Sequence, residues 1–242
     1  MADTGTEPSV DAATAPGWGL LDAVGAYAVA IVASTITAGL AMAITGDSRS
    51  VGTTVAGTVG LWIGFAGVPA VVVGLRHLGS LAGALRLRAR AVDVPVGVVA
   101  GAVSSWVLVR LVYALLLLTG LMHQQQLDRL DDPARNLFSR ATGPGIVAIV
   151  LVVVVGAPIV EELFFRGFLQ RALVARVGTL WGIVLTAVVF ALTHFEALQF
   201  AGLVAFGVVL GVLAHRSERL GPGIVAHMTF NAITVAILLA TR

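Results

Sequence analysis

Polar and ionisable side chains interrupt long apolar runs at three places in the C-terminal half of the chain. Such groups are costly inside a membrane, so each one is a candidate for function. Within each cluster two members are four residues apart, a spacing that puts both side chains on one face of a helix. The sequence windows are GAPIVEELFFRGFLQR with Glu161, Glu162 and Arg166, VVFALTHFEA with Phe190 and His194, and VAHMTFNAI with His227 and Asn231.

A carboxylate beside two histidines, with no thiol in the chain, suits the activation of a water molecule. Glu161 could remove a proton from this water as a general base, and His194 could orient the water. A divalent metal such as zinc could instead be bound by Glu161, His194 and His227. His227 and Asn231 could donate hydrogen bonds to a developing oxyanion. The expected reaction is a hydrolysis, most simply of a peptide bond.

The composition places these clusters inside a membrane. Of the 242 residues, 58% are apolar and 12% are charged, about half the charged share of roughly 25% in soluble domains. The mean hydropathy is +0.97. These values exclude a soluble domain, a disordered chain and a nucleic-acid-binding module. They predict an all-α polytopic transmembrane helical bundle in contact with membrane lipid.

Seven apolar stretches are long enough to be membrane spans, and the fourth is expected to bend at Pro158. The polar stretch 122–143 is expected to form a loop with a short surface helix. Residues 1–17 lack the basic start of a signal peptide and are expected to form a disordered cytoplasmic tail, followed by one transmembrane domain over 18–242. The predicted helices cover about 19–45, 52–75, 94–121, 144–176, 179–194, 198–214 and 222–240.

Arginines in the short loops predict the orientation. The connections at 76–93, 171–178 and 215–221 carry arginines, and seven spans put all three on one side, the cytoplasm. The protein is therefore expected in the cell membrane with a cytoplasmic N-terminus. Glu161 precedes the turn at Val177-Gly178 by about as many residues as His194 follows it, so both are expected at one depth. The segment 195–198 would then cap the site within the bilayer.

The three motifs resemble those of the CPBP family, which comprises CAAX proteases and bacteriocin-processing enzymes and is also called the Abi family. EELFFR is similar to the family motif EExxxR, FALTH to FxxxH and HMTFN to HxxxN, in the same order and on separate helices. The resemblance covers roughly 145–240, the expected catalytic core. It implies an intramembrane endopeptidase similar to type II CAAX prenyl proteases, acting on a peptide or membrane-protein substrate.

By this resemblance Glu161 is the water-activating base, and Glu162 and Arg166 support it. The remaining site residues implied are His194, His227 and Asn231. The family is described both as metal-dependent and as glutamate-dependent without a metal, so both forms of the site stay open.

Two other classes of function also stay open. A proton-coupled transporter could use the glutamates and histidines as a proton relay, although the internal repeat common in transporters is not visible. A non-catalytic membrane scaffold or immunity-type protein could keep the same fold, with Glu162 and Arg166 as a plain salt bridge. The zinc motif HExxH and the serine motif GxSxG are absent from the sequence, so neither chemistry is supported. Phe190 is expected only to pack.

Overall fold

A computed structural model of the protein describes residues 16–241, which fold into helices joined by short connections. Most of the predicted tail, 1–17, lies outside these residues. Six helices of the described chain are long and apolar enough to cross a membrane. The fourth, Pro144–Leu192, reverses direction at Gly178, whose φ is 78°. Its two arms make seven helical segments, in agreement with the sequence prediction, and the protein is a multi-pass membrane protein.

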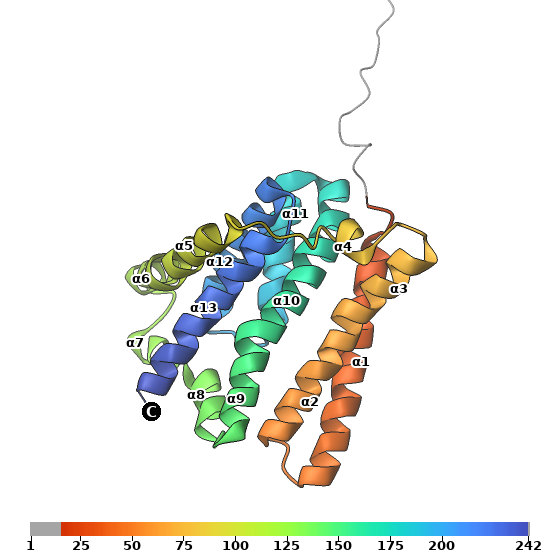
Figure 1. The fold of residues 1–242 in the computed structure, drawn as a ribbon. Helices are drawn as coiled ribbons and strands as arrows, with labels where there is room; N and C mark the ends of the chain where they lie inside the picture. The colour runs from red at the N-terminus through yellow and green to blue at the C-terminus, as the bar shows by residue number, and fades with distance from the viewer. Residues whose placement is uncertain (1–15, 242) are drawn as a thin grey trace, which may run out of the picture.

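Several of the long rods contain short π-helical segments, which divide them into the elements labelled in Figure 1. The first rod is α1 (Leu20–Thr45). The second contains α2 (Val51–Trp62), the π-helical segment Ile63–Gly67 and α3 (Val68–Leu75), and the third contains α5 (Asp93–Val103), the π-helical segment Ser104–Leu108 and α6 (Val109–Leu118). The short helices between rods are α4 (Leu81–Ala84), α7 (Gln124–Leu127) and α8 (Asp132–Ser139).

The C-terminal half holds the three motif clusters. Its long rod contains α9 (Pro144–Val150), a π-helical segment at Leu151–Gly156, α10 (Ala157–Glu162), a second π-helical segment at Leu163–Leu169 and α11 (Gln170–Leu192). The rods that follow are α12 (Phe200–Ser217) and α13 (Gly221–Ala240).

Pro158 lies in the first turn of α10, directly after the π-helical segment Leu151–Gly156. Proline lacks the N–H that an α-helix interior needs, and its ring clashes with a carbonyl one turn earlier. The wider hydrogen-bond register of the π-helical segment accommodates this defect, so the helix continues through Pro158. The rod reverses at Gly178, which is the turn that the sequence predicts, and Pro158 lies where the rod changes from π-helical to α-helical hydrogen bonding.

Glycines allow the helices to approach closely at three crossings. A Cβ atom on Gly64 would lie 2.3 Å from the backbone nitrogen of Ala30 in α1, and one on Gly101 would lie 2.4 Å from the carbonyl oxygen of Ala226 in α13. A Cβ atom on Gly207 of α12 would lie 3.0 Å from the Cβ atom of Ala187 in α11. Small residues of this kind are the usual contact points of membrane helices.

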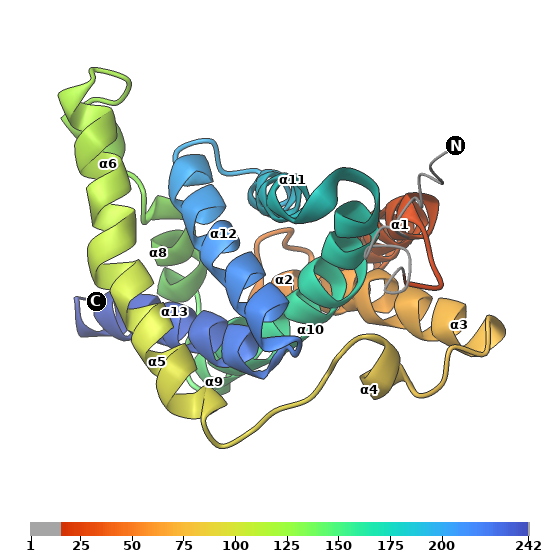
Figure 2. The same cartoon turned by 90° about the horizontal axis from the view of Figure 1, so that it is seen from above.

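The hairpin of α1 with α2–α3 and the rod of α5–α6 form opposite edges of the molecule, with α10 to α13 between them (Figure 2). Stacked aromatic rings join the hairpin to the centre, since the Phe65 ring lies 4.4 Å from Phe164. The connection between α11 and α12 lies partway along the bundle (Figure 1), where the Tyr113 hydroxyl donates to the Leu198 carbonyl. This agrees with the prediction that 195–198 does not reach the far end of the bundle.

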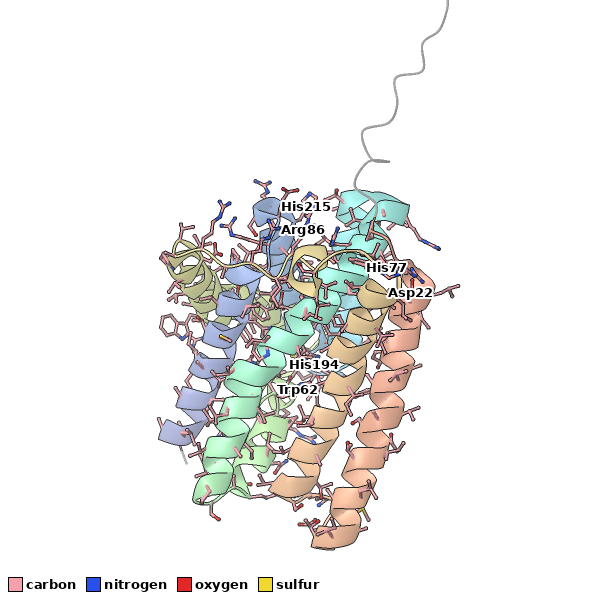
Figure 3. All side chains as sticks on the ribbon, turned by 45° about the vertical axis from the view of Figure 1, so that its right-hand side comes forward. Asp22, Trp62, His77, Arg86, His194 and His215 are labelled. Atoms are coloured by element: carbon pink, nitrogen blue, oxygen red, sulfur yellow. The ribbon has the colours of Figure 1, made fainter. Side chains whose placement is uncertain are left out.

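The arginine-bearing loops share one end of the bundle, which we call the arginine end. Figure 3 labels Arg86, His77 and His215 there, close to the start of α1 at Asp22. The end of α13 lies at the opposite end of the bundle (Figure 1), as an odd number of spans requires. The shared position of these loops is the arrangement that the sequence predicts, while their cytoplasmic location stays a prediction.

Candidate active site

The two adjacent glutamates of α10 face different surroundings. Consecutive residues on an α-helix are rotated by about 100°, so the two carboxylates cannot both face one cavity. The Glu161 side chain is 20% exposed and lines a cavity of about 650 Å³. The Glu162 side chain is fully buried behind the cavity wall. The sequence pair EE therefore divides into one accessible and one enclosed carboxylate.

Arg166 neutralises Glu162, as the four-residue spacing predicts. Its Nη1 donates to Glu162 Oε1 at 2.9 Å, and neither side chain is exposed. Its Nη2 donates to the Gly207 carbonyl of α12 at 3.1 Å, and its guanidinium lies 4.6 Å from the centre of the Phe190 ring. Arg166 thus connects both arms of the long rod with α12 through one buried side chain.

His227 of α13 lies against both glutamates. Its Nδ1 is 3.1 Å from Glu162 Oε1, and its Nε2 is 3.7 Å from Glu161 Oε2. An ionised carboxylate only accepts hydrogen bonds, so the ring proton belongs on Nδ1. This leaves Nε2 directed at Glu161, across a gap slightly too long for a direct hydrogen bond. The sequence predicts that His227 donates a hydrogen bond to an oxyanion. In the structure its ring lies between the two carboxylates, with one nitrogen facing each.

His194 lies at the end of α11, midway along the bundle (Figure 3). Its Nδ1 is 2.9 Å from the carbonyl oxygen of Phe190, which can only accept, so Nδ1 donates and Nε2 is left free. The Phe190 ring stands between the two histidines, 4.8 Å from the His194 ring and 5.7 Å from the His227 ring. Phe190 therefore sets the spacing of the histidines and packs on Arg166, a larger role than the packing expected from the sequence.

Asn231 lies one turn after His227 on α13, and its Nδ2 donates to the carbonyl of Val153 at 2.8 Å. Val153 belongs to the π-helical segment of the preceding rod. A side-chain amide carries two N–H groups, so a second donor of Asn231 stays free for the cavity that this residue lines.

The cavity beside Glu161 has a volume of about 650 Å³, within the usual range for substrate pockets. Its walls come from α1, α2, α8 and the helices of the C-terminal half, and most of its lining is apolar. Glu161, His194, His227 and Asn231 all line it, whereas Glu162 and Arg166 lie outside its lining. The structure thus brings together the predicted residues in two layers, one lining the cavity and one behind it.

The predicted metal ligands do not converge in this arrangement. Among residues 16–241, no three His, Asp or Glu side chains are grouped so that they could hold a metal ion. Glu161 Oε2 and His227 Nε2 are 3.7 Å apart, while His194 and His227 each pack in a T-shaped contact with the Phe190 ring. The Nδ1 atoms of both histidines are also engaged by protein acceptors. We therefore derive no step of the chemistry through a metal.

Gln170 is not part of the three sequence motifs, although it lies four residues after Arg166 on the same helix face. Glu162, Arg166 and Gln170 recur every four residues on one helix face. Gln170 is 3% exposed and donates from Nε2 to the Gly211 carbonyl at 3.0 Å, one turn along α12 from the carbonyl that Arg166 binds. A repeated polar residue at helical spacing inside an apolar run is the signal that could have found it.

A comparison with protein families gives a match over the region that carries the three motifs. No curated protein and no solved structure matches the chain. Residues 143–233 match the family model Rce1-like, described as type II CAAX prenyl endopeptidase Rce1-like. The matched residues include all three motifs, so the match agrees with the resemblance that the motifs indicate, and the C-terminal region of the chain is similar to this family.

Proposed function

We propose that the protein is an intramembrane endopeptidase that hydrolyses a peptide bond with a water molecule activated by Glu161. The observation that carries this proposal is the accessible Glu161 carboxylate in the wall of a cavity, 3.7 Å from His227 Nε2 and backed by the buried Glu162–Arg166 pair. The Rce1-like domain supports the same reaction class.

In the proposed reaction a water molecule lies between Glu161 and the free ring nitrogens that face the cavity. Glu161 takes one proton as the water oxygen attacks the carbonyl carbon of the scissile bond. The carbonyl oxygen then carries the negative charge of a tetrahedral intermediate. Glu161 returns the proton to the leaving nitrogen as the carbon–nitrogen bond breaks, which leaves a carboxyl group and an amine.

Glu162 and Arg166 act as positioning residues in this proposal. Arg166 pairs with the enclosed Glu162 carboxylate, and this carboxylate accepts the hydrogen bond of His227 Nδ1–H. His227 Nε2 is then unprotonated and can accept a hydrogen bond from the water beside Glu161. A buried carboxylate that orients a histidine in this way fixes its tautomer as well as its position.

The intermediate needs hydrogen-bond donors near its negative oxygen. The free N–H of Asn231 is our candidate, because Val153 already fixes the direction of this amide. His194 lies on the same cavity and orients the water or the carbonyl group from the side of α11. Removing a single donor of this kind typically costs about 10²–10³ in rate.

The proposed substrate is a peptide or membrane-protein segment with apolar side chains, because apolar residues line most of the cavity. We place the protein in the cell membrane with the arginine end in the cytoplasm, since loop arginines favour that side. The site then lies partway into the bilayer.

The test compares Glu161→Gln with wild type in membranes of expressing cells, by mass spectrometry of protein termini. Glutamine keeps the size of the side chain but cannot accept the proton, so termini made by the enzyme should disappear while insertion and melting temperature persist. Asp128→Asn is the matched control, since Asp128 is exposed and outside the cavity lining. Identical termini with wild type and Glu161→Gln would overturn the proposal. Flux that depends on pH would then favour a transporter, and function independent of Glu161 a scaffold.

A further inference from the structure

A second pocket lies at the arginine end and shares no lining residue with the active-site cavity. Its volume is about 170 Å³, enough for a small oxyanion, since a water molecule takes about 30 Å³ of liquid. Its walls come from the segment after α4, the turn of α11 and the end of α12. The ionisable lining residues are Arg86, Arg166, Arg171, His215, Arg219 and the single acid Glu218.

Two of these arginines are already neutralised from outside the pocket. Arg219 binds both carboxylate oxygens of Asp93, with the shortest contact at 2.6 Å, and this hydrogen bonding raises the pKa of Arg219 above its ordinary value. Arg166 is paired with Glu162 in the active site. The charge of the pocket therefore depends on the two remaining arginines.

Those two arginines have little acidic compensation. Arg171 contacts the Ala84 carbonyl and lies 5.0 Å from the centre of the Trp18 ring, and it pairs with no carboxylate within residues 16–241. Arg86 lies 3.5 Å from Glu218, whose side chain is 73% exposed and therefore easily exchanged for another anion. The pocket therefore has an excess of positive charge, and another anion can take the place of Glu218 beside Arg86.

The backbone holds this rim in an unusual conformation. Arg86 and Glu218 both have positive φ angles, 56° and 54°, which are unfavourable for residues other than glycine. The Leu220 N–H donates to the Arg86 carbonyl at 3.0 Å and locks the two segments together. Strained residues that the surrounding structure keeps in place tend to occur at functional sites.

Two lining residues of the pocket, Arg166 and Gln170, are 1% and 3% exposed. Each has an enclosed polar atom without a hydrogen-bond partner, Arg166 Nε and Gln170 Oε1. Gln170 Oε1 lies against Gly211 of α12, where a Cβ would be 2.7 Å away. The accessible charge of the pocket therefore comes from Arg86 and Arg171.

We propose that this pocket binds one phosphate group, either inorganic phosphate or the monoester headgroup of a lipid. Arg171 and Arg86 donate charge-assisted hydrogen bonds to its oxygens, and Arg86 exchanges Glu218 for the phosphate. This binding is independent of the proposed proteolysis.

The test uses the full chain in phosphatidylcholine nanodiscs, with inorganic phosphate titrated calorimetrically in one arm. In the second arm the nanodiscs contain phosphatidic acid, and the melting temperature is measured. Binding in the first arm assigns the ligand as free phosphate, and a rise in melting temperature only in the second assigns it as the lipid headgroup. Both results support the site if Arg171→Gln weakens the response about tenfold or more, the loss expected for a hydrogen bond to a charged group.

Two further variants guard against misfolding and against general surface charge. Glu218→Gln changes an exposed residue, so it should fold normally and bind phosphate more tightly than wild type. Arg76→Gln removes an arginine of the same end outside the pocket, and it should bind like wild type. No response in either arm would overturn the proposal. Equal losses for Arg76→Gln and Arg171→Gln, or an equal response to the diester lipid phosphatidylglycerol, would also overturn it.

Discussion

Arg166 offers the most direct test of how the site is built. We expect Arg166→Met to destabilise the protein, because it leaves the fully buried Glu162 carboxyl group without its cationic partner and with only His227 in contact. The variant also loses the donor to the Gly207 carbonyl. Methionine fills much of the volume of the arginine stem, so the loss reflects charge more than an empty space.

The size of the effect follows from the burial of the pair. Removing one partner of a buried salt bridge costs about 3–5 kcal/mol, because the other charge is left without compensation. Replacing both partners by neutral groups avoids that penalty. The double variant Glu162→Gln/Arg166→Met should therefore be more stable than Arg166→Met by about 2 kcal/mol or more, although both should lose catalytic activity.

The assay is reversible unfolding in mixed micelles, with the free energy of unfolding compared across the variants. Arg76→Met is the matched control, since the Arg76–Asp22 pair is even shorter, at 2.6 Å against 2.9 Å, but Arg76 is 45% exposed. Exposed pairs contribute only about 0–1 kcal/mol. The reasoning fails if Arg166→Met stays within about 1 kcal/mol of wild type, or if the double variant is less stable than the single one.

Three further predictions concern helix packing, the oxyanion donor and metal dependence. Gly101→Ala places a Cβ 2.4 Å from the Ala226 carbonyl oxygen, so it should lower the free energy of unfolding by about 1–3 kcal/mol. Gly39→Ala is the control and should be neutral in the same assay, because a Cβ on Gly39 meets nothing within 4 Å. Asn231→Leu should reduce kcat of peptide cleavage about 10²-fold. It should also lower the stability slightly, because the hydrogen bond to the Val153 carbonyl is lost. An unchanged kcat would contradict the proposed role of Asn231. Dialysis against a chelator should leave cleavage unchanged, whereas loss restored by added zinc would favour the metal-assisted alternative.

Much of the helical framework is predictable from the sequence because an apolar run is a local property. The expected span 19–45 corresponds to α1, Leu20–Thr45, and the turn at Gly178 divides the fourth rod where the count of residues requires it. The π-helical segments are not predictable in this way. They depend on how each rod fits its neighbours, as at Leu151–Gly156, where the segment accommodates Pro158 and presents the Val153 carbonyl to α13.

For the candidate site, the sequence predicts which side chains share a helix face, but not how the faces of different helices meet. The spacing of Glu162 and Arg166 predicts their contact without knowledge of the fold, since both lie on one helix. The contacts of His227 depend on how α13 is rotated against α10. That rotation is fixed by close packing, because a Cβ on Gly223 would lie 3.0 Å from Glu162 Oε2. A histidine that bridges two carboxylates therefore follows from the packed helices and not from the motif.

The adjacency of Glu161 and Glu162 has a physical consequence for the whole site. Since neighbouring residues of a helix face different directions, a carboxylate that faces the cavity places the next one inside the protein. An enclosed carboxylate needs a counter-charge, and the closest position for it on the same face is four residues later, where Arg166 lies. Arg166 and Gln170 in turn need acceptors, and they donate to the carbonyls of Gly207 and Gly211. A side chain on Gly211 would collide with Gln170, because its Cβ would lie 2.7 Å from Gln170 Oε1. One accessible glutamate thus accounts for the second glutamate, the arginine, the glutamine and the glycine pair of the facing helix.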